Sequence, residues 1–210
     1  MEQPGWPVIQ DLIARSSLTI QVLPTDEIQR DAALEALQVT TRSFLGAVVG
    51  ECGALIVDDG WLRILGAGVP GLPGVHEASG QLDAPPPLLD VAWDVVGGRF
   101  AINGGGLDAP PGEVCYWGPD TLEWSPIGGG HADFVAWALS DALHDFYDSL
   151  RWPSWEREVG GLALDHGLSW MPPPFTTEGR DAARASRAAV PLTELHRFYE
   201  DVAEQLRTAE

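Results

Sequence analysis

The chain contains no lysine: its basic residues are 12 arginines, set against 31 aspartates and glutamates, for a formal net charge of −19. A lysine ammonium group is needed in P-loop phosphate binding, protein-kinase phosphotransfer, PLP Schiff bases and Ser-Lys hydrolases. The composition excludes these four classes. It also argues against a nucleic acid partner, because phosphate binding draws on basic residues. A basic protein is the partner that the charge favours, although the charge equally fits a general role in solubility.

Cysteine and long apolar runs are scarce as well. Cys52 and Cys115 are the two cysteines and have no metal-type spacing, so we expect two buried thiols. The first residues lack the layout of a secretory signal, and the most apolar stretch, residues 44–57, is too short to span a membrane and contains Glu51. These features predict a cytoplasmic protein that makes no use of a membrane.

Motifs for catalysis and for cofactors are missing. There is no G-x-S-x-G, and no two histidines have the i, i+4 spacing of a zinc-binding helix. Residues 66–71 match G-x-G-x-x-G, but Pro70 and Pro73 lie where a dinucleotide-binding helix would begin. We therefore predict no catalytic residues, no cofactor and no metal site.

The patterns that are present predict an α+β fold with a mostly antiparallel sheet flanked by helices. Helices are expected over residues 7–16, 25–38, 132–150 and 154–159 and from residue 191, and strands over 18–23, 45–49, 54–57, 61–65, 88–96, 99–103, 113–117 and 121–125. Thr25 is the expected cap of the second helix, with Ile28, Leu34 and Leu37 buried. Residues 66–87, rich in Gly and Pro, are expected to form a surface loop.

Domain organisation follows from the same patterns. Residues 1–170 are predicted to form a single α+β domain. Residues 171–190, rich in Pro, Ala and Arg, are interpreted as a linker, and residues 191–210 as a C-terminal amphipathic helix that packs on the domain.

Carboxylates cluster on the outer face of the predicted helix 132–150. Asp141, Asp145 and Asp148 lie three or four residues apart, and like charges at this spacing near a helix C-terminus cost a few tenths of a kcal/mol each. Their structural interpretation is a solvated face relieved by Arg151. Their functional interpretation is an acidic docking ridge for a basic protein. Trp61 and Trp117 flank turns, and we expect both to be half exposed, as interface aromatics often are.

A different class of function could use the polar run Thr40, Thr41, Arg42 and Ser43, which lies between apolar segments. Arg42 would suit a carboxylate or phosphate, in a pocket of a small-molecule-binding protein or a hydrolase. The structural alternative is a helix terminus whose hydroxyl groups satisfy backbone groups.

Several sequence blocks together resemble a bacterial family known as domain of unknown function 2625. They include WPVIQDLI, ECGALIVDDGWLRILG, DVVGGRFAINGG, DTLEWSPIG and FYDSLRWPSWEREV, and the resemblance runs from Trp6 to about Trp170. This chain has His131-Ala132 where the family pattern has Tyr-Ser. The order of hairpin, strand and long helix is more distantly similar to the SUKH superfamily, which includes many bacterial immunity proteins that bind toxins.

These observations lead to one hypothesis and one alternative. The chain is expected to be a non-enzymatic, cytoplasmic binding protein with a SUKH-like fold, an immunity-type factor that captures a basic effector. The alternative is the small-molecule-binding protein or hydrolase with its pocket near residues 40–43.

Overall fold

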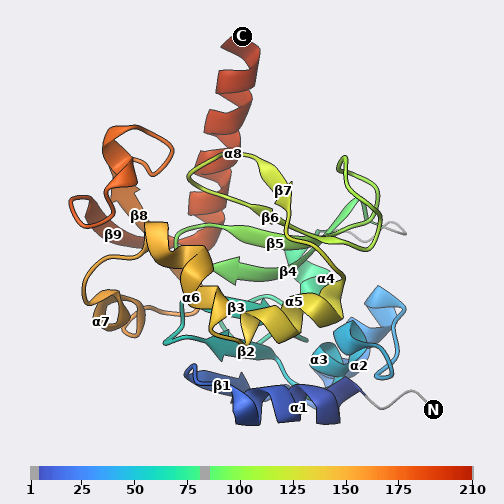
Figure 1. The fold of residues 1–210 in the computed structure, drawn as a ribbon. Coiled ribbons are helices and arrows are strands. Elements are labelled where there is room, and N and C mark those ends of the chain that lie inside the picture. The colour runs from blue at the N-terminus through green and yellow to red at the C-terminus, as the bar shows by residue number, and fades with distance from the viewer. Residues whose placement is uncertain (1–4, 81–85, 210) are drawn as a thin grey trace.

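The computed structural model describes residues 5–80 and 86–209 (Figure 1). Its centre is a seven-stranded antiparallel sheet in which every strand pairs with the next one along the chain. The strands are β1 (Ile20–Leu23), β2 (Ala54–Val57), β3 (Leu62–Leu65), β4 (Leu88–Asp94), β5 (Arg99–Asn103), β6 (Val114–Trp117) and β7 (Trp124–Pro126). The predicted α+β class and the mostly antiparallel sheet are confirmed.

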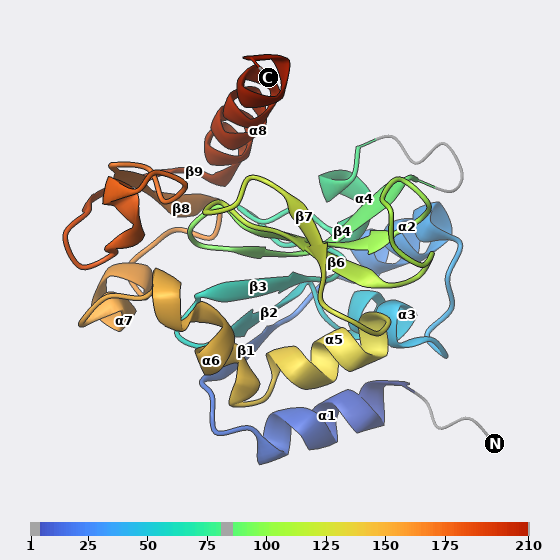
Figure 2. The same ribbon diagram turned by 45° about the horizontal axis from the view of Figure 1, so that its top comes forward.

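Helices cover both faces of this sheet because neighbouring residues of a strand point to opposite sides. In β5, the ring of Phe100 lies 5.0 Å from that of Phe134 on one face, whereas Arg99 pairs with Glu200 on the other. Figure 2 shows α1, α5 and α6 on one side of the sheet and α8 on the other. The helices are α1 (Gly5–Arg15), α2 (Glu27–Leu37), α3 (Phe44–Glu51), α4 (Val75–Ala78), α5 (His131–Ala138), α6 (Ala142–Tyr147), α7 (Trp155–Val159) and α8 (Leu192–Ala209).

The prediction of a strand over residues 45–49 is wrong, because these residues belong to α3. A short apolar run fits a buried strand and a buried helix equally well, so periodicity cannot separate the two. The deciding feature is the cap: the Ser43 hydroxyl accepts a hydrogen bond from the Gly46 backbone N–H at 3.0 Å. Residues 46–50 are all buried.

The predicted helix 132–150 is also wrong in its continuity. It is broken into α5, α6 and a 3-10 turn, Asp148–Leu150. The break falls at Ser140, whose hydroxyl donates to the Trp137 carbonyl at 2.8 Å. A serine side chain that competes for helix carbonyls favours such a break.

The second helix differs from the prediction in two details. Its N-cap is Asp26 rather than Thr25, with the carboxylate accepting from the Gln29 N–H at 2.8 Å. Ile28 was expected to be buried but is 84% exposed. The helix buries the face that carries Ala33 instead.

Residues 171–190 contain regular structure within the segment interpreted as a linker. Strand β8 (His166–Met171) pairs with β9 (Ser186–Pro191) over six residues in a separate two-stranded sheet, and a 3-10 turn spans Glu178–Arg180. Residues 186–190, the last five of the segment, are therefore strand rather than linker. Helix α8 follows β9 directly and buries Leu192, Leu195 and Tyr199.

The segment 66–87, predicted to be a surface loop, contains buried residues and short regular structure. Ala67 is fully buried, and Val69 and Leu72 form an antiparallel bridge. Helix α4 begins only at Val75, beyond the G-x-G-x-x-G pattern, so no helix N-terminus faces that pattern. Residues 81–85 lie outside the described residues. In the part of the chain that the structure describes, every helix is too short or too polar to cross a lipid bilayer.

Candidate functional site

The turn between β2 and β3 places two carboxylates at one end of the sheet. Asp58, Asp59 and Gly60 all have positive φ angles, of 55°, 52° and 94°. Aspartate and glycine tolerate this left-handed conformation better than most residues do, which explains the Asp-Asp-Gly sequence. This turn orients Asp58 toward the segment that follows α6.

Asp58 forms the centre of a charge cluster. Its carboxylate, 7% exposed, pairs with Nη2 of Arg151 and lies 3.3 Å from Nε2 of His144. The Arg151 guanidinium also stacks over the rings of Trp155, at 4.3 Å, and Trp61, at 4.8 Å. Arg151 is thus fixed by Asp58 and two indoles. The expectation that Arg151 offsets the negative charge of Asp148 is wrong, because the Arg151 guanidinium pairs with the Asp58 carboxylate instead.

A groove of about 620 Å³ opens beside this cluster, and we call it the acidic groove. It is lined by residues 17–19, 58–59 and 151–156 together with His144 and Asp148. Four of these residues are carboxylates, whereas Arg151 is the one arginine among them. Since Arg151 already pairs with Asp58, the remaining surface of the groove is negative.

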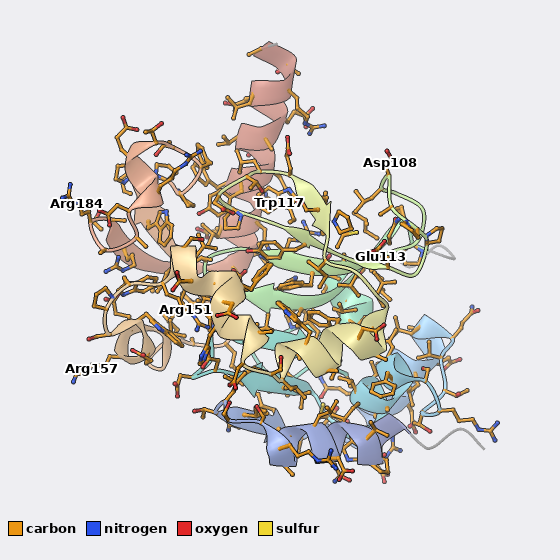
Figure 3. All side chains as sticks on the ribbon, in the orientation of Figure 1. Asp108, Glu113, Trp117, Arg151, Arg157 and Arg184 are labelled. Carbon is orange, nitrogen blue, oxygen red and sulfur yellow. The ribbon has the colours of Figure 1, made fainter. Side chains whose placement is uncertain are left out.

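The predicted ridge of Asp141, Asp145 and Asp148, which we call the acidic ridge, lies next to the acidic groove. All three residues are exposed, but they do not lie on one long helix: Asp141 is the N-cap of α6, Asp145 is in α6, and Asp148 begins the 3-10 turn after it. Asp148 lines the groove itself, and Asp141 accepts a hydrogen bond from Ser17, another residue of the groove wall. Ridge and groove therefore form one continuous surface. Figure 3 shows Arg151 near α6, with Asp108 and Glu113 on the other side of the view.

The expectation that Trp61 and Trp117 are half exposed is wrong. Trp61 is 0% and Trp117 7% exposed. The Trp61 ring lies 5.0 Å from Trp155 and 5.3 Å from Tyr147, and Trp117 is covered by Tyr199 of α8. The prediction of exposure relied on the position of each tryptophan beside a turn. The residues that cover them come from distant parts of the chain, so the local sequence does not reveal them. Neither tryptophan can contribute an exposed ring to a partner.

Below the aromatic cluster lies a buried carboxylate that the sequence analysis missed. Asp94, with no exposed surface, accepts hydrogen bonds from the hydroxyls of Tyr116 and Tyr147, both at 2.9 Å, and from the backbone N–H groups of Val96 and Gly98, at 3.0 and 2.7 Å. Burial raises the pKa of Asp94, and these four hydrogen bonds oppose the rise. All its acceptor positions are used, so its role is to hold β4, β6 and α6 together.

The polar run at residues 40–43 is exposed and connects α2 to α3. The Ser43 hydroxyl caps α3 and also donates to the Thr40 carbonyl at 3.1 Å. These contacts match the structural alternative given in the sequence analysis, a helix terminus whose hydroxyl groups satisfy backbone groups. Arg42 is exposed beside it. A ligand site at these residues stays a prediction.

Metal ligands do not gather in the described ranges, where no three His, Cys, Asp or Glu side chains are placed to hold an ion. Cys52 and Cys115 are free and buried, as predicted. Burial raises the pKa of Cys52 to about 12, so its thiol is neutral at physiological pH.

Comparison with known families identifies the chain. The family model described as "Protein of unknown function DUF2625" matches residues 1–195. The chain belongs to the DUF2625 family. Among its relatives is YbfG, an uncharacterised protein of Escherichia coli strain K12, which is 38% identical over 196 residues, 92% of this chain and 89% of YbfG. An uncharacterised protein of Haemophilus influenzae strain Rd is 32% identical over 167 residues, 77% of this chain and 73% of the relative.

The DUF2625 match extends further than the resemblance recognised from the sequence, which ended near Trp170. It includes β8, β9 and the first residues of α8. The strand pair and the segment between its strands are therefore part of what DUF2625 members share. The acidic groove, at residues 17–156, also lies wholly within the family match.

Proposed function

We propose that this DUF2625 protein is a non-enzymatic binding protein that captures a basic segment of a partner protein on its acidic ridge and in its acidic groove. The observation that carries the proposal is the continuity of the two: the exposed carboxylates on and beside α6 lead directly into a groove whose single arginine already pairs with Asp58.

Unpaired charge supports this proposal. In the described residues, no ion pair within 4.0 Å involves Asp145, Asp148 or Glu156. These carboxylates repel one another, and a cationic partner would relieve that repulsion. Complementary charge of this kind increases the association rate and suppresses unsuitable partners.

Rigidity of the base supports it further. Leu143, Tyr147 and Leu150, on the inner side of the ridge, are at most 6% exposed. Arg151 is held between Asp58 and two indole rings directly below the groove. Because these side chains are already ordered, a partner that binds here loses little free energy to ordering the surface.

Backbone strain is concentrated at the same place. Five non-glycine residues of the described chain have positive φ, and Asp58, Asp59 and Ser154 of the groove are three of them. Such residues cost of order 1–3 kcal/mol each and tend to persist at binding and active sites. The clustering favours the groove over other surfaces of the protein.

The finer proposal is an immunity-type role in the cytoplasm, with a basic toxin or effector as the partner. It is supported by the acidic surface and by the similarity in layout to the SUKH superfamily noted from the sequence. Fold-level similarity of this kind suggests a function without assigning residues to it.

The experiment compares two double variants that remove the same charge. Asp145→Asn with Asp148→Asn neutralises the acidic ridge, and Asp108→Asn with Glu113→Gln neutralises two carboxylates on the loop between β5 and β6 (Figure 3). Binding of a nona-arginine peptide is measured by fluorescence anisotropy at low salt. We expect the ridge variant to bind about tenfold more weakly than the unmodified protein, because two close charge pairs are lost.

The control variant should bind nearly as well as the unmodified protein. Equal weakening by the two variants would contradict the proposal, since it would show attraction to the net charge alone. Melting temperatures confirm that both variants fold, and the ridge variant should be slightly more stable because a like-charge contact is removed.

A further inference from the structure

Arg63 is a buried cation whose hydrogen-bonding capacity is only partly used. It lies in β3, opposite Ile56 of β2 and Trp93 of β4, and is 1% exposed. Its Nη1 atom donates to the carbonyls of Leu164 and His166, both at 2.7 Å. These two bonds fix the guanidinium against the segment between α7 and β8.

The other edge of the guanidinium is free. Nε of Arg63 is buried with no partner among the described residues, and neither bond to a carbonyl uses Nη2. The arginine has no ion-pair partner within 4.0 Å in those residues. Burial lowers its pKa to about 10, so it stays charged at neutral pH. An unpaired buried charge of this kind is costly. Because Nε is closed off from solvent, Nη2 is the donor that remains for a ligand.

A cavity of about 290 Å³ adjoins this arginine. Its volume is near the lower end of the range for small-molecule sites. Thr19, Gln21 and Asp59 supply polar groups in its wall, and the apolar part of the wall is formed by Ile56, Val159, Leu162 and Leu164. Asp59 and Arg63 both line the cavity, and no ion pair within 4.0 Å joins them. The carboxylates whose charges act on Arg63 are those of Asp94 and Asp165, which are not among the lining residues.

We propose that this cavity binds a small α-amino acid with an aliphatic side chain. The ligand carboxylate accepts a hydrogen bond from Nη2 of Arg63, the ammonium group faces Asp59, and the side chain lies against Ile56, Val159 and Leu164. A ligand with both charges matches the two walls, whereas a simple anion would be repelled by Asp59. The cavity is distinct from the acidic groove proposed above as the partner surface, although Thr19 and Asp59 line both.

The test is calorimetric titration of the unmodified protein with L-leucine and with two analogues that each lack one charge. The first, 4-methylpentanoate, has no ammonium group, and the second, 3-methylbutylamine, has no carboxylate. We expect leucine to bind and each analogue to bind about tenfold or more weakly, because each loses a charge-assisted interaction. Absence of binding by leucine, valine and isoleucine at millimolar concentration would overturn the proposal. So would equal affinity for leucine and 4-methylpentanoate.

Variants assign the roles within the cavity. Asn suits the left-handed backbone at position 59 as well as Asp does, so Asp59→Asn should fold and should bind leucine and 4-methylpentanoate with similar affinity. Arg63→Lys should abolish detectable binding of leucine; should it fail to fold, the analogue series and Asp59→Asn still decide the question. Asp148→Asn is the matched control and should leave leucine affinity unchanged, which separates this proposal from the proposed function.

Discussion

Two buried histidines should make the stability of this protein fall as the solution is acidified. His131 and His196 are each 8% exposed, and burial lowers their pKa values to about 4 and about 3. In the unfolded chain both titrate near pH 6.5. The folded state keeps them neutral while the unfolded state takes up protons, so the free energy of unfolding is highest above about pH 6.5 and decreases as the pH falls from there toward 4.

The size of the effect follows from these values. One pKa unit corresponds to about 1.4 kcal/mol, so lowering the pH from 7 to 5 should cost about 2 kcal/mol for each histidine and about 4 kcal/mol for both. Glu158 adds little in this range. The hydrogen bond from Arg187 lowers its pKa, so its stabilisation is lost only below its unfolded value of about 4.5.

His131→Leu isolates one of the two contributions. Neither ring nitrogen of His131 has a hydrogen-bond partner among the described residues, so leucine removes a buried unsatisfied group. We expect the variant to be at least as stable as the unmodified protein at pH 7 and to lose about 2 kcal/mol less between pH 7 and 5. Other groups titrate in both proteins and cancel in the comparison.

Urea denaturation at the two pH values measures this difference, with His196 present in both proteins as the internal reference. The reasoning is refuted if His131→Leu loses as much stability as the unmodified protein between pH 7 and 5, since His131 would then not be kept neutral by burial.

Three further substitutions test other parts of the structure. Asp94→Asn should lower the free energy of unfolding by about 2–4 kcal/mol in urea denaturation, because a neutral amide cannot accept from both tyrosine hydroxyls and both N–H groups; a loss below about 1 kcal/mol would contradict the assigned network. Ser43→Ala should cost about 1 kcal/mol through loss of the cap on α3, and an unchanged denaturation midpoint would show that the cap contributes nothing. Arg42 is exposed, so Arg42→Ala should change the free energy of unfolding by less than about 0.5 kcal/mol. A metabolite that raises the melting temperature of the unmodified protein but not of this variant would instead support the small-molecule alternative.

The sheet could be predicted from the sequence because its information is local. Alternating strands and turns such as Asp58–Asp59–Gly60 fix each hairpin, and each strand pairs with the next one in the chain. The error at residues 45–49 had a local cause too. A five-residue apolar run is too short for its periodicity to separate a helix from a strand. Ser43 could have marked the start of a helix, but the sequence fits it equally to a ligand pocket.

The site depends on contacts between distant residues, which a single sequence does not reveal. The acidic ridge was predicted, because its carboxylates are close in sequence. Its position beside Asp58 and Arg151 was not, since these two residues are 93 positions apart. The free edge of Arg63 was likewise hidden, because its two carbonyl partners lie 101 and 103 positions away.

The most direct test of the proposed function is the association rate with a basic peptide as ionic strength increases. Stopped-flow measurements with nona-arginine should show fast association that slows steeply as salt shortens the Debye length from about 10 Å at 0.1 M toward about 3 Å at 1 M. Neutralising Asp141, Asp145 and Asp148 together should reduce both the rate and its salt dependence, whereas neutralising Asp108, Glu113 and Glu123 should change them little. A rate that is insensitive to salt, or that falls equally for both triple variants, would contradict binding at the acidic ridge.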